Sequence, residues 1–385
     1  MGKKRKARAT PETHPAATGI DQPRGGGYRH SQDEADILTA REIAADEDLF
    51  APASVEEKKA FEPQHKSVSY WEDAWRRLRK NYIALASFGV IALLILFACL
   101  GPLFMGYHYD EQVRGSENLK PLAYSQQELA RIAAGEKVFP HVFGTDSHGR
   151  DLLVRLMYGA RVSMIIGITA ALLTLVIGVL YGSIAGYAGG RVDMVMMRIV
   201  DVIYSVPDIL VALLFAVTLK PLLTDFANNN QARLLGRLMI SLGPSIIAIF
   251  IAFALLYWTS LARIVRGQIL QLKQQEYVSA ARALGANDAR IILKHLLPNS
   301  IGPLVAATCL QIPTAIFLES FLSFLGLGVN APMTSLGSLA SDALGGMYTY
   351  THRLIIPAAL LSLLILSFNL FGDGLRDALD PRLKK

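Results

Sequence analysis

The chain has 385 residues, of which 52% are hydrophobic and 18% charged, and its formal net charge is +6. A soluble domain usually carries about 25% charged residues, so this composition argues against an ordinary soluble protein. The excess of positive charge does not indicate a nucleic-acid partner. Lys and Arg gather at the ends of apolar runs, where they would meet lipid headgroups.

The first 66 residues are polar and rich in Pro, Glu, Lys and Arg. Such a composition buries too little apolar surface to fold alone, and we expect a disordered N-terminal extension in the cytoplasm. No short basic stretch leads into an apolar core at this end, so a cleavable signal peptide is not predicted.

Six later runs are long enough to cross a bilayer, which takes about 20 mostly apolar residues. We therefore predict an all-α integral membrane protein with six transmembrane helices. An amphipathic leader and the first span are expected at 67–104, followed by an extracytoplasmic segment at 105–160. The predicted spans cover residues 82–104, 162–187, 194–219, 243–262, 302–327 and 354–375.

The third run is interrupted by charged residues and by Pro207, which is expected to kink its helix. Arg198 and Asp201 lie three residues apart near its inner end and are expected to pair with each other.

Glycines repeat every four residues at the end of the second run, which places them on one helical face. Small residues let a second helix approach closely, so this face is expected to pack against another helix. The repeat consists of Gly178, Gly182, Gly186 and Gly190.

The orientation follows from the distribution of Lys and Arg in short loops. Basic residues precede the first span, fill the loop between the fourth and fifth spans, and recur in the tail. These three segments are predicted to be cytoplasmic, with both termini inside. The transmembrane core would cover 161–376, including a cytoplasmic loop at 263–301, and a tail would follow at 377–385.

Sequence motifs for catalysis are absent. The chain contains no G-x-x-x-x-G-K-[ST] phosphate loop, no G-x-S-x-G and no H-E-x-x-H. His141, His148 and His295 are isolated in the sequence, and Cys99 and Cys309 lie inside apolar runs. We therefore expect no catalytic residues, no metal site and no ATP hydrolysis by this chain.

The most informative segment is EYVSAARALGANDARIILKHLLPNS, residues 276–300. A first helix is expected over 276–284, ended by Gly285 in a left-handed conformation. A second is expected over 288–296, stopping at Pro298. This helix–turn–helix would lie at the cytoplasmic surface. Two interpretations remain open from the residues alone, a docking surface for a partner and a solvated basic loop.

This segment resembles the EAA loop of ABC importer permeases, which reads Glu-Ala-Ala, three residues, Gly, nine residues, Ile, one residue, Leu-Pro. Ser279 stands where that pattern has Glu, and Glu276, one turn earlier, is the candidate for the acidic group. The resemblance implies docking in a cleft on a separate ATPase subunit. The implied docking residues are Glu276, Tyr277, Ala280, Ala281, Arg282, Gly285, Ala286, His295 (where the pattern has Ile) and Pro298.

Other segments narrow the resemblance to the dipeptide, oligopeptide and nickel importer group, and within it to the second, C-type permease. They are WEDAWRRLRKN at 71–81, FGTDSHGRDLLVRLMYGARVS at 143–163, ESFLSFLGLG at 319–328 and NLFGDGLRDALDPRLK at 369–384. Leu336 departs from the group, since many relatives have Trp there.

The resemblance implies a type I ABC importer permease in a bacterial cytoplasmic membrane, carrying di- or oligopeptides. The implied partners are a second permease, two ATPase subunits that bind ATP and Mg, and an extracellular solute-binding protein. The chain itself would bind no cofactor. Nickel or another small solute remains an alternative cargo, and a self-contained secondary transporter or a membrane scaffold is a more distant alternative.

Two acidic residues inside the predicted spans are candidates for the translocation path, because an ionised side chain is costly within a bilayer. Glu319 would either meet a peptide amino group or serve as a structural partner for a polar residue of the companion permease. Asp208 is the second candidate.

Overall fold

The computed structural model describes residues 69–231 and 233–380. The predicted N-terminal extension and the last five residues of the tail lie outside this part of the chain. Apart from two isolated bridges, Ala123–His141 and Thr145–Asp151, the regular secondary structure of the described residues is helical.

Six helices are long and apolar enough to cross a membrane, which confirms the predicted fold class. The second span is the longest and begins at Leu152, ten residues before the expected start. The spans are α4 (Tyr82–Leu100) with the 3-10 turn η2 (Gly101–Phe104), α6 (Leu152–Ala188), α8 (Asp208–Asn229), α10 (Pro244–Leu256) with α11 (Trp258–Leu272), α15 (Ile301–Phe324) and α17 (His352–Leu379).

Shorter helices occupy the connections between the spans. They are α3 (Tyr70–Lys80), α5 (Gln126–Ala133), α7 (Gly190–Tyr204), α9 (Leu234–Leu242), α12 (Glu276–Ala283), α13 (Asp288–Arg290), the π-helix η3 (Ile291–Leu296), α14 (Leu297–Asn299), α16 (Leu336–Ala343) and the 3-10 turn η4 (Leu344–Gly346).

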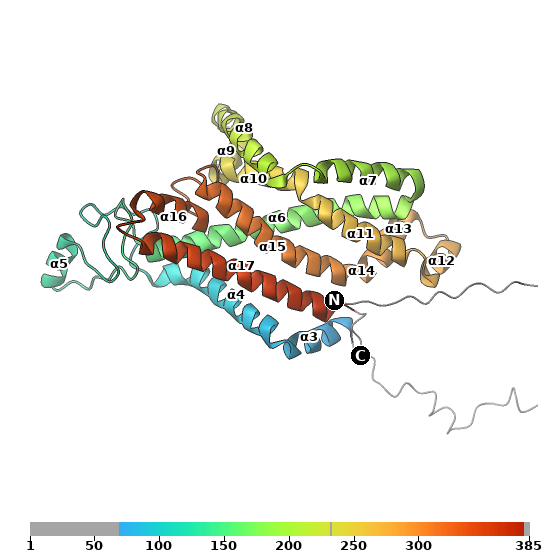
Figure 1. Ribbon diagram of the computed structural model, residues 1–385, viewed down its shortest axis with the longest axis horizontal. Coiled ribbons are helices and arrows are strands. Elements are labelled where there is room, and N and C mark those ends of the chain that lie inside the picture. The colour runs from blue at the N-terminus through green and yellow to red at the C-terminus, as the bar shows by residue number, and fades with distance from the viewer. Residues whose placement is uncertain (1–68, 232, 381–385) are drawn as a thin grey trace, which may run out of the picture. The chain divides into compact units, whose positions relative to one another are not determined.

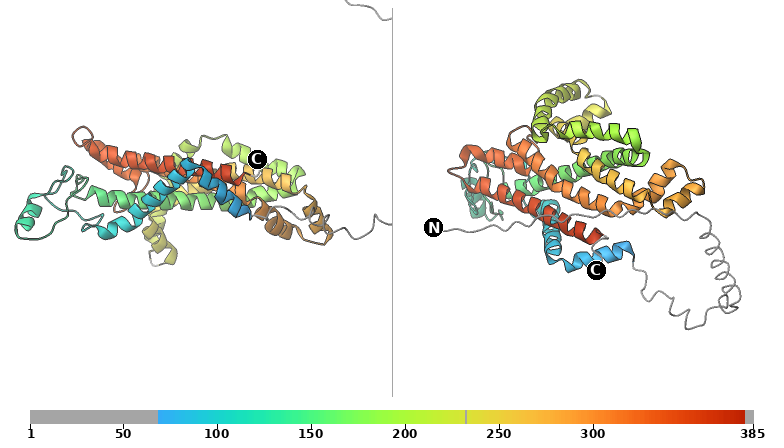
Figure 2. Two further views of the ribbon diagram at one scale, coloured as in Figure 1. Left: turned by 90° about the horizontal axis from the view of Figure 1, so that it is seen from below. Right: turned by 45° about the vertical axis from the view of Figure 1, so that its right-hand side comes forward.

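The long helix α6 organises the bundle, because it packs against α4, α10, α11 and α15 (Figure 1). Helix α17 packs between α15 and α4 on another side (Figure 2). The predicted glycine face packs against α11. A Cβ at Gly182 would lie 2.5 Å from the Ala262 carbonyl oxygen, so only glycine allows the two helices to approach this closely. Gly178 and Gly186 face α11 in the same way, but Gly190 faces open space beyond the end of α6.

The third span differs from the prediction. Pro207 does not kink one long helix; the chain leaves the helical path there, and two helices, α7 and α8, run in different directions (Figure 1). The span is therefore α8, and α7 lies alongside α6 and α11. Proline fixes its own backbone and restricts the residue before it, so it does not readily continue a preceding helix. The chain therefore ends one helix before Pro207 and starts another after it, instead of bending a single helix.

Buried charges hold the segment before α6 to the bundle. The Asp146 carboxylate accepts hydrogen bonds from Arg150 Nε at 2.7 Å and from Arg155 Nη1 at 2.6 Å. The Arg155 guanidinium also donates to Asp342 of α16 at 3.2 Å. Burial by itself would raise the pKa of Asp146, but the charge of Arg155 and hydrogen bonds from Arg150 lower it below the usual value.

A second buried cluster centres on His141, whose side chain is 1% exposed. Its ring nitrogens lie 2.7 Å from Asp151 Oδ2 and 2.9 Å from Glu128 Oε1. The Tyr107 ring stacks on the imidazole, with 4.5 Å between ring centroids. Burial opposes the charged imidazole, yet hydrogen bonds and charge from Asp151 and then Glu128 raise the pKa of His141.

Candidate functional site

The first helix of the 276–300 segment ends as predicted. Gly285 has φ of +82°, which lies in the left-handed region. Its N–H donates to the Arg282 carbonyl and the Ala286 N–H donates to the Ala281 carbonyl, both at 3.0 Å. This pair of bonds is a Schellman motif, which satisfies the last carbonyls of a helix and favours glycine at the left-handed position. A Cβ at Gly285 would meet nothing within 4 Å.

The second helical stretch runs past its predicted end. It continues as α13, η3 and α14 from Asp288 to Asn299, with Pro298 inside the last turn. The π-helix η3 immediately precedes that turn, where the proline ring would crowd the carbonyl of an ordinary α-helix. The loop also begins later than the expected residue 263, because α11 continues to Leu272.

Three apolar side chains anchor the loop to the spans. Val278 is 1% exposed, and Ile291 and Leu296 are 0% exposed. They form one cluster with Val265 and Ile269 of α11. The resemblance did not single these residues out, and the sequence alone does not separate them from apolar neighbours such as Leu293, which is exposed. They make the loop a rigid extension of the bundle.

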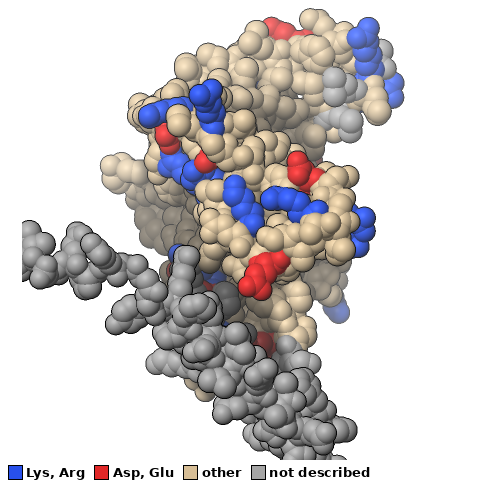
Figure 3. All heavy atoms as spheres, turned by 90° about the vertical axis from the view of Figure 1, so that its right-hand side faces the viewer, with Lys and Arg blue, Asp and Glu red and all other residues tan. Residues whose placement is uncertain are grey.

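The predicted docking residues lie mostly on the opposite, exposed side of the loop. Glu276, Tyr277, Ala280, Arg282, Gly285 and Pro298 are exposed, whereas Ala281, Ala286 and His295 are half-buried. Leu284 and Leu293, which the resemblance did not include, are 89% and 65% exposed. Figure 3 shows this end of the molecule, where Lys and Arg lie among uncharged areas and several Asp and Glu residues. The loop therefore presents small residues and two leucines on a surface that carries charges of both signs.

The C-terminal end of α6 is tied to the loop by side chains that the sequence analysis did not single out. Tyr187 Oη donates to Asp288 Oδ1 at 2.6 Å, and Arg282 Nη2 donates to Tyr187 Oη at 3.4 Å. Lys273 Nζ donates to the Gly186 carbonyl at 2.9 Å, where a cation favours the C-terminal end of a helix. These contacts join residues about 100 positions apart, so no local pattern could reveal them.

Helix α7 is fastened to α11 by two Arg–Asp pairs. Arg266 holds Asp193 through two hydrogen bonds of 2.5 Å, and Arg263 donates to Asp201 at 2.9 Å. The expected pair of Asp201 with Arg198 is therefore wrong. Hydrogen bonding from Arg266 lowers the pKa of Asp193.

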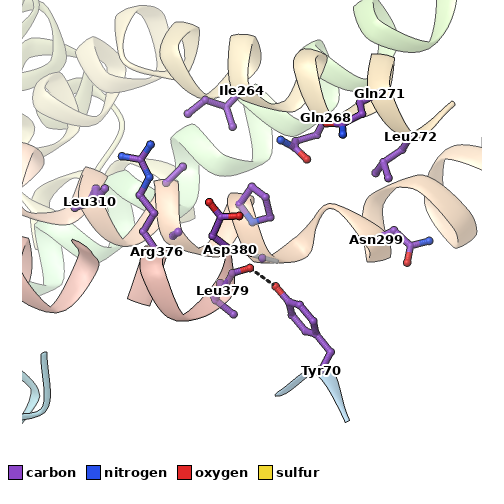
Figure 4. A pocket seen from close by; sticks show the side chains of 14 residues that line it. Tyr70, Ile264, Gln268, Gln271, Leu272, Asn299, Leu310, Arg376, Leu379 and Asp380 are labelled. Atoms are coloured by element: carbon purple, nitrogen blue, oxygen red, sulfur yellow. Dashed lines mark hydrogen bonds between the residues drawn. The ribbon is translucent and has the colours of Figure 1, made fainter. Parts of the chain in front are cut away.

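A cavity of about 480 Å³ opens beside the loop, between α11, α15 and α17 (Figure 4). Gln268 and Arg376 face it from two walls, and Asn299 faces it from the end of the loop. Helix α3 closes one side, where Tyr70 Oη donates to the Leu379 carbonyl at 2.9 Å. The end of α17, the start of α3 and the end of the loop thus meet at one place.

Glu319 is enclosed by its own chain, with 0% exposure. Its carboxylate accepts hydrogen bonds from Ser163 of α6 at 2.9 Å, Ser323 at 2.6 Å and Ser320 at 3.2 Å. Ser163 also accepts the Leu336 N–H at 3.3 Å. In this arrangement Glu319 is enclosed within the chain, and the hydrogen-bond partners named here belong to this chain.

Asp208 is exposed at the first residue of α8, directly after the Ser205–Pro207 break, and not in the middle of a span. Its Oδ1 accepts the Ile209 N–H at 2.8 Å. No cluster of three or more His, Cys, Asp or Glu residues with metal-binding geometry occurs within 69–231 and 233–380.

Comparison with known proteins agrees with this architecture. Residues 178–385 match the family of binding-protein-dependent transport system inner membrane components, and residues 69–121 match the N-terminal transmembrane domain of oligopeptide transport permease C. The oligopeptide transport system permease protein OppC of Bacillus subtilis is 41% identical over 337 residues, covering 88% of this chain and 98% of that protein.

The dipeptide transport system permease protein DppC of the same organism is also 41% identical, over 85% of this chain and 91% of its own. A chain of the solved MetNI methionine ABC transporter superposes with a TM-score of 0.43 at 20% identity, over 58% of this chain and 96% of that chain. By its family match and by its similarity to full-length relatives, this chain belongs to the binding-protein-dependent transport system inner membrane components.

Proposed function

We propose that the chain is the C-type transmembrane permease subunit of an ATP-driven importer for di- or oligopeptides. The observation that carries this proposal is the 41% identity to an oligopeptide and a dipeptide transport permease over nearly their whole lengths. Nickel or another small solute is the alternative cargo. The exposed, rigidly anchored loop at 276–299 supports the part of the proposal that concerns ATP-driven coupling.

The partners follow from this role. Two ATPase subunits, which bind ATP and Mg, dock on the 276–299 loop, and a second permease completes the membrane channel. A solute-binding protein delivers peptide on the opposite side. The loop and both termini face the cytoplasm, and the 105–151 segment and α16 face outside. The chain then needs no catalytic group of its own.

The loop transmits force because it is fixed to two spans at once. Val278, Ile291 and Leu296 bury apolar surface against α11, and each such side chain is worth about 1.5–3 kcal/mol. The Tyr187 and Lys273 contacts add α6 to the same unit. When the ATPases close, displacement of the loop moves α6 and α11 together as a rigid element.

Reconstitution tests the proposal. The chain would be co-expressed with its neighbouring permease and ATPase genes, purified, and placed in liposomes with the solute-binding protein on one side. We expect ATP-dependent uptake of a radiolabelled tripeptide, and no uptake with a non-hydrolysable ATP analogue. ATP-dependent uptake of nickel but not peptide would support the alternative cargo. Uptake without any ATPase subunit would overturn the proposal.

A further inference from the structure

The break between α7 and α8 opens onto a cavity beside the fourth span. The chain leaves the helical path at Ser205–Pro207, between the two helices. The fourth span, Pro244–Leu272, passes next to this break and remains helical through Tyr257, whose N–H donates to the Phe253 carbonyl at 3.1 Å. Residues from the break and from this span line a single cavity of about 340 Å³, including Ser205, Asp208, Tyr257 and Ser260. Interrupted helices of membrane transporters often form substrate sites.

The level of this cavity follows from packing against α6. Trp258 of the fourth span and Val200 of α7 pack in one cluster with Ile177 and Tyr181 of α6. Tyr181 lies about 10 Å along the helix axis from the α6 end at Ala188, at 1.5 Å per residue. The cavity therefore lies beside α6, about two helical turns before the C-terminal end of that helix.

The charges along α7 and the start of α8 leave one carboxylate unmatched. Asp193 is paired with Arg266 and Asp201 is paired with Arg263. Asp208, the third in this series, forms no ion pair with another residue of the described ranges. Tyr257 lines the same cavity as Asp208. A carboxylate that lines a cavity without a cation of its own chain attracts a cation from elsewhere.

We propose that this cavity binds the N-terminal ammonium group of the transported peptide, with Asp208 as its counter-ion. An ammonium group offers three N–H donors and no acceptor. The cavity offers acceptors from the break and from the fourth span: the Asp208 carboxylate and the hydroxyls of Ser205 and Ser260. This inference rests on the proposed peptide cargo and names the part of the peptide that the membrane subunit recognises.

Asp208 also has a structural role to separate from binding. A carboxylate in the first turn of α8 stabilises the helix N-terminus, and Asp208 accepts the Ile209 N–H there. Asp208→Asn keeps the side-chain size and the hydrogen-bond acceptor but removes the charge. Asp208→Glu keeps the charge. The pair of variants therefore separates the charge from the helix start.

The experiment measures charge in the cavity directly. Cys99→Ser and Cys309→Ser remove the native thiols, and Ser260→Cys places one thiol at the cavity in the assembled complex in lipid nanodiscs. Cationic trimethylammonium-ethyl and anionic sulfonato-ethyl methanethiosulfonates are applied in turn. The measured quantity is the rate of modification by the cationic reagent divided by the rate with the anionic reagent. This ratio at Ser260→Cys is then divided by the same ratio at the exposed Gln274→Cys. We expect a ratio about fivefold in favour of the cation, lost in Asp208→Asn and restored in Asp208→Glu.

Ligand specificity is read with trialanine and N-acetyl-trialanine as protecting ligands. Trialanine should slow modification of Ser260→Cys, and the acetylated peptide should not. Protection should disappear in Asp208→Asn. Equal protection by both peptides, or a rate ratio that Asp208→Asn leaves unchanged, would overturn the site. If Ser260→Cys fails to assemble, Ser205→Cys reports on the same cavity. Failure of the proposed function is distinct, since it appears as absent uptake by the wild-type complex.

Discussion

The two ends of the molecule are built in opposite ways. We name the two ends after the proposed topology. At the outer end, Asp146 and Arg155 are 2% and 3% exposed and bind each other, and Arg155 also binds the exposed Asp342. At the inner end, the 276–299 loop buries apolar anchors but leaves Glu276 and Arg282 exposed. Buried charge pairs tolerate little change in geometry, whereas an exposed face of small residues leaves room for a second protein. The outer end is thus fixed by charge pairs, and the inner end keeps an open surface, which is the surface proposed for docking.

We expect the largest effect from Gly285→Asp. The left-handed backbone costs a non-glycine residue about 1 kcal/mol or more, and the added carboxylate projects into open space on the exposed face of the loop. We expect normal membrane abundance, loss of co-purifying ATPase subunits and abolished transport. Ser279→Ala on the same loop is the matched control and should retain both. If Gly285→Asp assembles like the wild type, this face is not the docking element.

At the outer end, Arg155→Leu should cause the largest loss of stability. It leaves the Asp342 carboxylate without its 3.2 Å partner and Asp146 with only Arg150. Removing one member of a buried charge network costs about 3–5 kcal/mol. Thermal unfolding of the detergent-solubilised complex measures the change. Arg290→Leu, an exposed residue of the inner loop, should change the unfolding temperature little; equal effects at both sites would contradict the contrast between the two ends.

The His141 cluster makes the outer end sensitive to alkaline pH. The folded-state pKa of His141 is raised above 6.5, so its stabilising contribution is complete below that pH and is lost as pH rises through the raised value. Each unit of the shift corresponds to about 1.4 kcal/mol. We expect the unfolding temperature of the complex to fall as pH rises above 6.5. His141→Gln should flatten that part of the profile, whereas exposed His148→Gln should leave it as in the wild type.

The smallest expected effect is at the inner end, in Tyr187→Phe. This change removes the hydroxyl that joins α6 to Asp288 at 2.6 Å but keeps the ring. A hydrogen bond to a charged group contributes about 1.5–3 kcal/mol at most, and less when exposed. We expect assembly to persist and peptide-stimulated ATP hydrolysis to become partly uncoupled from uptake. An unchanged ratio of peptide transported to ATP hydrolysed would show that the apolar contacts of the loop with α11 couple hydrolysis to transport without the Tyr187 hydroxyl.

Local patterns in the sequence account for the elements but not for their partners. Apolar runs located all six spans, and the Ala-rich stretch before Gly285 correctly predicted a helix with a left-handed end. The run at 194–219 misled because hydropathy cannot tell a kink from a break at Pro207. The sequence could not show that Ser163 binds Glu319, because the two residues lie 156 positions apart. Ion pairs such as Arg263–Asp201 depend on helix packing, which only the folded chain defines.

The contact between Tyr70 and Leu379 also bears on how the protein is made. Helix α3 is among the first described elements to leave the ribosome and α17 is the last, and 309 positions separate the two residues that bond. Until α17 arrives, Tyr70 and Arg77 lack the backbone carbonyls that they contact at its C-terminal end. These contacts between α3 and α17 therefore form only after α17 has been synthesised. A premature stop within α17 would leave Tyr70 and Arg77 without these hydrogen bonds.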